Sequence, residues 1–219
     1  MSEAREKPKR RYDASRRRAR ADETRDRVVE AAGRVFTAHG YAAATIPLIA
    51  TEAGCSIETV YRSAPGKAGL LAAAVQAALA GGAARAEQPV EQRSGIRRVI
   101  DEPDPRRALR FYADTQPGLW ARTGPLLRVL DEAAPGDAIL IDLQRSIAAQ
   151  RLLGQGRIAD MLAERGQLRS DLPVQRARDI VWTLCGQACF DALVTARGWT
   201  KEEYRDWLAD MLAGALLSS

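Results

Sequence analysis

Histidine and cysteine are scarce in this sequence. Its 219 residues include one histidine, His39, and three cysteines. A small, odd number of cysteines argues against a disulfide-stapled scaffold and favours a reducing compartment, so we expect a cytoplasmic protein. Cys185 and Cys189 lie one helical turn apart, which permits a redox or metal role, but the single imidazole lies far from them in the chain. We interpret the pair as small side chains buried at a helix contact, and we expect no metal and no other cofactor.

The patterns that build active sites are also missing. The sequence has no glycine-rich phosphate loop and no Ser/His/Asp or metal-ligand arrangement. We therefore expect that the protein is not an enzyme. A helical enzyme that uses dispersed carboxylates is the alternative that the sequence leaves open.

Long apolar runs and alternating segments are absent too. No stretch approaches the roughly 18 consecutive apolar residues of a membrane span. The basic N-terminus is followed by no apolar segment, unlike a secretory signal. No run of residues alternates between apolar and polar side chains as a half-buried strand does. The sequence therefore predicts an all-α protein without membrane contact.

Positive charge is concentrated at one end of the chain. The formal net charge is +5, and residues 1–22 carry this whole excess in two basic clusters with few apolar neighbours. Such a composition predicts a disordered basic arm over residues 1–22. The arm could simply solubilise the protein. Beside a DNA-reading motif it could instead bind phosphates or enter a minor groove. The candidate DNA contacts in the arm are Arg16, Arg17, Arg18 and Arg20.

Residues 24–71 predict three short helices. The first runs from Arg25 to His39, with apolar side chains on one face and Thr24 as its N-cap. Gly40 follows it, and glycine readily adopts the left-handed conformation that ends a helix.

The next two helices have the spacing of a helix-turn-helix. Thr45 caps the first of them, and Pro47 lies in its first turn, where no intrahelical N–H is lost. Gly54 turns the chain without a Cβ clash, and Ala50 is small enough for a close helix crossing. The following helix, residues 56–63, presents its polar side chains outward. The residues that set the spacing are Ile49, Ala50, Gly54, Cys55 and Val60.

Several short motifs in this stretch agree in order and spacing with one family. They are Val35-Phe36-x-x-His39-Gly40-Tyr41, Ala43-x-Thr45-Ile46, Ile49-Ala50-x-x-Ala53-Gly54-x-Ser56, Thr59-Val60-Tyr61 and Lys67-x-x-Leu70-Leu71. The stretch resembles the DNA-binding domain of the tetracycline-repressor (TetR) family of bacterial transcription regulators. That family usually has Phe where Ala64 stands and an acidic residue where Ala68 stands. We expect the end of the recognition helix to pack less firmly at Ala64.

The resemblance implies a double-stranded DNA operator as partner and a role for each matching position. Phosphate contacts are implied for Thr45, Tyr61 and Lys67, although Tyr61 could instead be a core aromatic. Candidate contacts to base edges are Ser56, Ile57, Glu58, Thr59 and Arg62. Arg62 favours guanine. Glu58 could accept from cytosine, or pair with Arg62 on the next turn, which is the interpretation we favour.

The rest of the chain predicts a helical body. We expect helices over residues 66–81, 105–115, 117–133, 137–164, 173–197 and from a capping box at Thr200 onward. We expect the DNA-binding domain at residues 23–67 and a ligand-binding and dimerisation domain at residues 68–219.

The last two helices predict a homodimer. The helix over residues 173–197 is apolar around much of its circumference, and the final helix has an apolar stripe. One chain offers no obvious second wall for both, so we expect the pair to pack on its copy as a four-helix bundle. The family resemblance implies the same arrangement. The predicted interface residues are Val181, Leu184, Ala188, Tyr204, Trp207, Leu208, Met211 and Leu212.

By resemblance, the body binds a small, largely apolar effector. The candidate contacts are Phe111, Tyr112, Trp120, Leu127, Leu143, Ile147, Gln150 and Trp182. The expected function is that of a repressor that the effector releases from a near-palindromic operator. A constitutive DNA-binding protein with a solid core is the rival, and the position of the operator could make the protein an activator.

Overall fold

The computed structural model describes residues 10–83 and 94–218, and within these residues every regular element is a helix. The all-α prediction is therefore confirmed. None of the described helices is long and apolar enough to cross a bilayer. The α-helices are α1 (Arg10–Ala43), α2 (Ile46–Ala53), α3 (Ile57–Ser63), α4 (Gly66–Ala80), α5 (Ser94–Asp101), α6 (Pro105–Ala133), α7 (Ala138–Glu164), α8 (Val174–Leu184), α9 (Gln187–Phe190) and α10 (Lys201–Leu216). A 3-10 turn covers Ala134–Gly136, and a π-helix covers Asp191–Ala196.

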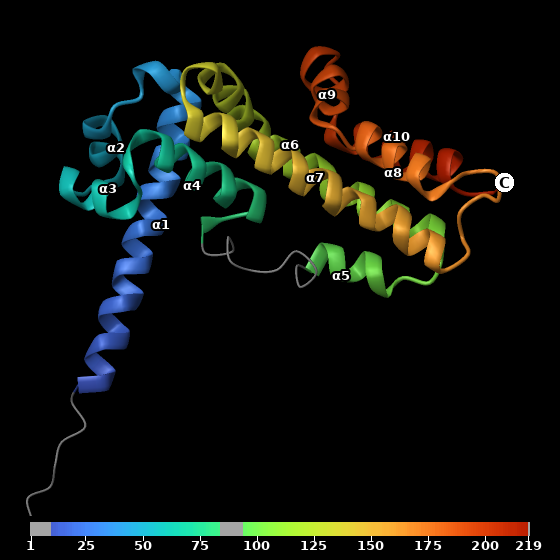
Figure 1. Cartoon of the computed structure of the whole chain (residues 1–219), viewed down its shortest axis with the longest axis horizontal. Helices are drawn as coiled ribbons and strands as arrows, with labels where there is room; N and C mark the ends of the chain where they lie inside the picture. Colours follow the sequence, from blue (N-terminus) through green and yellow to red (C-terminus); the bar gives the residue numbers. More distant parts are fainter. Residues whose placement is uncertain (1–9, 84–93, 219) are drawn as a thin grey trace, which may run out of the picture.

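The helices form a small head and a long body (Figure 1). In the head, α2 and α3 pack against the C-terminal half of α1, and α4 leads into the body. In the body, α6 and α7 run side by side away from the head. Helix α5 covers one side of α6, whereas α8 packs on α7 and α10 packs on α6.

The head forms as the local sequence signals predict. The Thr45 hydroxyl accepts a hydrogen bond from the Leu48 N–H at 3.3 Å and so caps α2. Gly54 ends α2 with φ of +62°, a left-handed conformation that side chains with a Cβ rarely adopt. Ile49 and Val60 are fully buried at the corner between α2 and α3. The helix-turn-helix prediction is therefore confirmed.

Helix α1 begins earlier than predicted. It starts at Arg10, so residues 10–22 are helical rather than disordered, whereas residues 1–9 lie outside the described part of the chain. Thr24 does not cap the helix; it lies inside it and donates to the Arg20 carbonyl at 2.8 Å. Arginine and alanine dominate this stretch, and both are strong helix formers. Gly40 breaks the helical geometry with φ of +72°, close to the predicted end.

Helix α6 runs through a proline that was expected to divide it. Pro117 and Pro125 both lie inside one helix of 29 residues. Each proline removes an intrahelical hydrogen bond and crowds the preceding turn, at a cost on the order of 3 kcal/mol. Contacts of α6 with α1, α4, α5, α7 and α10 offset this cost along its whole length. Helix α5, which holds α6 from one side, was not predicted.

The expected helix over residues 173–197 is broken. Helix α8 ends at Leu184, and Gly186 has an extended ψ of 151° before α9 begins. A Cβ at Gly186 would lie 3.2 Å from Nη1 of Arg151 and 3.1 Å from the Thr183 carbonyl oxygen. Glycine therefore allows the break and the close approach of the arginine, and α9 turns away from the axis of α8 (Figure 1).

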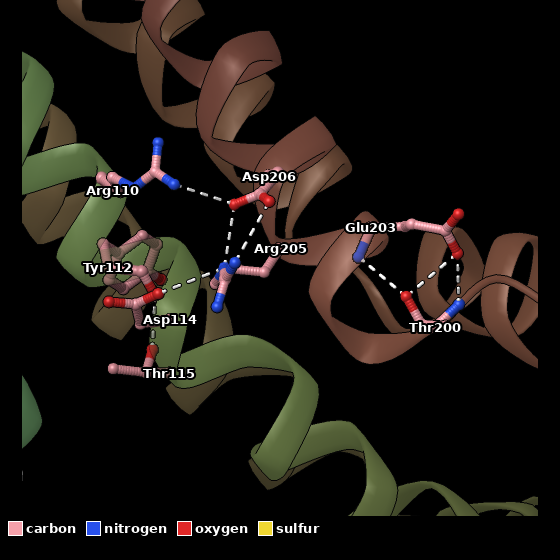
Figure 2. A network of polar contacts seen from close by, with 8 residues as sticks. All are labelled: Arg110, Tyr112, Asp114, Thr115, Thr200, Glu203, Arg205 and Asp206. Atoms are coloured by element: carbon pink, nitrogen blue, oxygen red, sulfur yellow. Dashed lines mark hydrogen bonds and ion pairs between the residues drawn. The ribbon is translucent and has the colours of Figure 1, made fainter.

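Helix α10 is fixed to α6 by charged side chains, and its predicted capping box is present. Figure 2 shows Thr200 and Glu203 exchanging hydrogen bonds at the start of α10. In the same view, Arg110 of α6 donates to Asp206 of α10 at 3.1 Å. Arg205 lies 3.6 Å from the Asp114 carboxylate and completes the connection.

Half of the predicted dimer interface lies inside the single chain. Val181, Tyr204, Leu208 and Leu212 are fully buried, because α7 covers α8 and α6 covers α10, walls that the sequence did not reveal. These four residues therefore offer no surface to a partner. The remaining predicted interface residues keep some exposure, and they are Leu184, Ala188, Trp207 and Met211.

The described residues contain two apolar cores. The first extends from the head through α4 to Leu126, Val129 and Leu130 of α6 and into the first half of α7. The second fills the far end of the body, between α5, α6, α7, α8 and α10. The head thus shares its core with one end of the body.

Candidate nucleic-acid interface and effector cavity

Helix α3 presents a polar surface to solvent. The candidate base-reading residues Ser56, Ile57, Glu58 and Arg62 are exposed, and Thr59 is half-buried. Their helix is short, and it keeps its position because Val60 and Ser63 are buried on its inner side. The head therefore brings all the predicted base-reading residues onto one outer face.

Hydrogen bonds order the side chains on this face. The Ser56 hydroxyl caps α3 by accepting from the Thr59 N–H at 3.3 Å, and it lies 3.1 Å from the Thr59 hydroxyl. The Arg62 guanidinium donates to the same Thr59 hydroxyl at 3.2 Å. Arg62 is therefore held along the face of α3, in reach of a base edge in a groove.

Glu58 does not make the close pair with Arg62 that we favoured. Arg62 donates to Thr59 instead, and the charge of Arg62 is the smallest influence on the Glu58 carboxyl. The backbone N–H of Glu58 and the Ser56 hydroxyl hydrogen-bond the carboxylate and lower its pKa. The Glu58 carboxylate is thus ionised and fixed at the N-terminus of α3, where the helix dipole favours negative charge.

The predicted phosphate contacts surround this face. Thr45 is exposed at the start of α2, and Tyr61 is 59% exposed, so Tyr61 is not a core aromatic. Lys67 donates to the Ala42 carbonyl at 3.1 Å, and its ammonium lies 4.5 Å from the centroid of the Tyr41 ring. Burial lowers the pKa of Lys67. These contacts leave ammonium donors for a phosphate, because an ammonium has three N–H groups.

The arginines of the predicted arm lie on a helix. Arg16, Arg17, Arg18 and Arg20 are exposed on the N-terminal half of α1, which extends away from the head (Figure 1). They thus have a rigid support rather than the mobile one expected. Whether they contact DNA stays a prediction.

The body contains a cavity of about 350 Å³, which we call the inner cavity. It lies between α4, α5, α6 and α7, and Gln76, Leu79 and Ala80 are its contribution from α4. A neighbouring cavity of about 420 Å³ lies between α6, α7, α8 and the segment that leads into α9. Trp120, Leu127, Ile147 and Arg151 line both.

Most of the predicted effector contacts line these cavities. Those in the inner cavity are Tyr112, Trp120, Leu127, Ile147 and Gln150, and Trp182 lines the neighbouring one. Phe111 and Leu143 line neither of these two cavities. The Phe111 ring lies under the Arg98 guanidinium of α5, with 3.5 Å from Cζ to the ring centroid. Leu143 packs against the first core, near the start of α7.

Apart from Gln150, the polar lining of the inner cavity was missed. The missed residues include Gln116, Arg151 and Gln155. Gln116 lies four residues after the predicted contact Tyr112 on α6. Arg151 and Gln155 lie four and eight residues after the predicted contact Ile147 on α7. A polar side chain in phase with an apolar stripe was the available signal: Gln116 lies between Tyr112 and Trp120 on one face of α6, one turn from each.

Residues 28–74 match the sequence profile described as bacterial regulatory proteins, tetR family. The match covers the end of α1, the helix-turn-helix and the start of α4. The DNA-binding head of this chain is therefore similar to that of TetR-family regulators. No curated protein matches it in sequence.

Solved structures of transcriptional regulators have the same fold as this chain. A TetR-family transcriptional regulator from Mesorhizobium loti is 20% identical with a TM-score of 0.70, covering 92% of this chain and 99% of that one. FadR from Bacillus subtilis, in complex with stearoyl-CoA, is 15% identical with a TM-score of 0.67, covering 86% and 97%. NalD from Pseudomonas aeruginosa, the secondary repressor of the MexAB-OprM multidrug efflux pump, is 17% identical with a TM-score of 0.67, covering 91% and 99%. At such identities the likeness establishes the fold.

Helix α4 connects the two candidate sites. Its first turn carries Lys67 beside the head, and its last turns line the inner cavity with Leu79 and Ala80. Arg122 of α6 holds the end of α4 through the Ala78 carbonyl at 3.5 Å. Helix α4 thus packs on α1 of the head and borders the inner cavity with its last turns.

Proposed function

We propose that this chain is a ligand-responsive repressor that binds a near-palindromic operator in the cytoplasm and leaves it when a small, largely apolar molecule enters the inner cavity. The observation that carries the proposal is the position of α4, which borders the DNA-reading head at one end and the cavity at the other. The cavity favours ligand control over the rival, a constitutive DNA-binding protein with a solid core.

The DNA-binding part of the proposal rests on α3. We assign base contacts to its outer face and phosphate contacts to Thr45, Tyr61 and Lys67. The α1 arginines add charge that contributes to affinity without sequence preference. We assign DNA binding to residues 23–67 and effector binding and dimerisation to residues 68–219.

The effector part rests on linkage. A ligand releases DNA only as far as it prefers the state that cannot bind the operator. Two of the similar structures support this assignment: FadR from Bacillus subtilis holds stearoyl-CoA, and NalD is described as a repressor. The sign of regulation depends on where the operator lies, so an activator is the variant outcome.

The decisive experiment is to select bound sequences from genomic DNA with the purified protein and then to footprint the selected sites. We expect a two-fold symmetric footprint with half-sites about 34–36 Å apart or at a related spacing. Compounds related to the products of neighbouring genes are then titrated into the complex, and an effector should lower operator affinity. A single asymmetric half-site bound by a monomer contradicts the dimeric operator, and ligand binding without loss of DNA affinity contradicts the switch.

We propose that the homodimer forms through α8 and α10. Met211, Trp182 and Val174 are each about two-fifths exposed on these helices, beside the half-buried Leu184 and Trp207. Met211→Arg should convert the dimer to a monomer in light scattering coupled to size-exclusion chromatography. The matched control is Ile139→Arg at the start of α7, where the side chain is 60% exposed away from both helices. A dimer that survives Met211→Arg places the interface elsewhere.

A further inference from the structure

Arg151 is a half-buried cation without an acidic partner among the described residues. Its guanidinium carbon lies 4.4 Å from the centroid of the Trp182 ring, and none of the described carboxylates forms an ion pair with it. The groups that act on its charge are the Cys185 thiol and the Tyr112 phenol, both neutral at pH 7. Burial lowers the pKa of Arg151, but an arginine stays protonated in this range. A buried charge in this setting calls for a counter-charge.

Three further polar atoms at the inner cavity have no partner in the described structure. They are Oε1 of Gln116, Oε1 of Gln155 and Nε1 of Trp120. Each of these side chains is more than nine-tenths buried, and all three line the cavity. Buried polar atoms are normally hydrogen-bonded, so these atoms indicate a missing partner.

The orientation of the two glutamine amides is set by their nitrogen atoms. Nε2 of Gln116 donates to the Thr115 hydroxyl at 2.8 Å, and Nε2 of Gln155 donates to the Cys185 carbonyl at 3.1 Å. The unpaired atoms are therefore oxygens, which accept hydrogen bonds. The missing partner of these oxygens is a donor, whereas the missing partner of the Trp120 N–H and of Arg151 is an acceptor.

These groups lie on two facing helix stripes. Gln116 and Trp120 are one turn apart on α6, and Arg151 and Gln155 are one turn apart on α7. The phenol of Tyr112 on α6, one turn before Gln116, interacts electrostatically with Arg151 of α7, which brings the two stripes together. The rest of the described lining is apolar or neutral, except for a second cation, Arg122, and it includes no carboxylate.

We propose that the effector of the inner cavity is an apolar-bodied hydroxy acid. Its carboxylate binds Arg151 and the Trp120 N–H, its hydroxyl donates to the oxygens of Gln116 or Gln155, and its hydrocarbon body packs on Leu119, Leu127 and Ile147. This assignment rests on the proposed function, because it treats the inner cavity as the effector site, and it names the chemical class that the site selects.

The test compares three ligands that differ by one group each: 3-hydroxydecanoate, decanoate and 1,3-decanediol. Binding to the full chain is measured without DNA, by calorimetry and by tryptophan fluorescence, to which Trp120 and Trp182 at the cavities contribute. We expect the hydroxy acid to bind about tenfold or more tighter than the diol, because charge-assisted hydrogen bonds are roughly twice as strong as neutral ones. The acid without the hydroxyl should lie between them.

Variants of the cavity test the side chains that bind the carboxylate and those that bind the hydroxyl separately. Arg151→Gln should abolish the preference for the hydroxy acid over the diol, whereas the exposed Arg145→Gln on the same helix should keep it. Gln116→Met combined with Gln155→Met should remove the preference for the hydroxy acid over the plain acid and leave the charge preference intact. Thermal unfolding without ligand checks that each variant is folded; if Arg151→Gln is unfolded, Arg151→Lys, which keeps the charge, should retain the charge preference.

Three outcomes overturn the proposal: equal affinity for the diol and the hydroxy acid, a charge preference that survives Arg151→Gln, or no binding of the hydroxy acid by the folded wild-type chain. Other outcomes test the proposed switch independently of the ligand site. Selective binding of the hydroxy acid without release of operator DNA supports the site and contradicts the switch. Release by a neutral ligand, without the Arg151-dependent preference, supports the switch and contradicts the site.

Discussion

The Arg62 guanidinium donates a hydrogen bond to the Thr59 hydroxyl at 3.2 Å, and this contact holds the arginine along the outer face of α3. If Arg62 reads a guanine, Arg62→Ala should cost roughly 1–3 kcal/mol of discrimination at that base pair. The measurement is a competition gel shift between the operator and a version with that base pair exchanged. Arg145→Ala on α7 is the control and should leave discrimination unchanged. Equal loss of affinity for both DNAs would mean that Arg62 contacts phosphate instead.

Variants of Tyr61 and Lys67 should differ in how strongly their DNA affinity depends on salt. Lys67→Gln removes a cation, so the slope of log affinity against log salt should fall by about 1 per subunit. Tyr61→Phe removes a neutral hydroxyl and should weaken binding without changing the slope. Fluorescence anisotropy with operator DNA at several salt concentrations separates the two. Because Lys67 also contacts Ala42 and Tyr41, the unfolding temperature of its variant must be compared with that of the wild type.

Gly54 should be the costly glycine of the head. Its φ is +62°, so Gly54→Ala strains the turn by roughly 1–2 kcal/mol although open space surrounds the position. Gly154 lies inside α7 with no atom within 4 Å of an added Cβ, so Gly154→Ala should stabilise the chain by roughly 0.5–1 kcal/mol. Denaturant unfolding measures both. Opposite signs are expected, and a Gly54→Ala variant as stable as the wild type would contradict the left-handed turn.

The capping box of α10 should make stability depend on pH. Hydrogen bonds from the Thr200 N–H and hydroxyl lower the pKa of Glu203 in the folded protein. A carboxyl with a lowered folded-state pKa stabilises the fold above its unfolded pKa, about 4.3, and this contribution is lost as the pH falls through the folded-state pKa. Glu203→Gln should therefore destabilise the chain at pH 7 and have less effect near pH 3. A destabilisation that grows on acidification would contradict the assignment.

The head could be predicted from sequence because its signals are local. Thr45 and Ser56 cap helices within three residues of themselves, and Gly54 ends α2 where it stands. The sequence could not predict that α6 continues through Pro117, because this depends on contacts with helices that are distant in sequence. The same cause explains why α10 was assigned to a partner: its buried stripe packs on α6 of its own chain.

The cavity was predicted only in part, for a related reason. An apolar stripe on a helix locates the wall, so Trp120 and Ile147 were found. The same stripe marks the glutamines in phase with it as candidates, but a glutamine near an apolar stripe becomes informative only when its partners are known. Gln155, for instance, is identified by a bond to the carbonyl of Cys185, thirty residues away in the chain.

The first core has a consequence for attempts to exchange DNA-reading heads between regulators of this fold. Side chains of α6, among them Leu126, Val129 and Leu130, belong to the same apolar core as the helix-turn-helix. A chimera that is cut after α3 or within α4 therefore joins two unmatched halves of one interior. A functional graft has to carry this part of α6 along with the head, or redesign the seam, so the modularity suggested by the sequence ends inside the body.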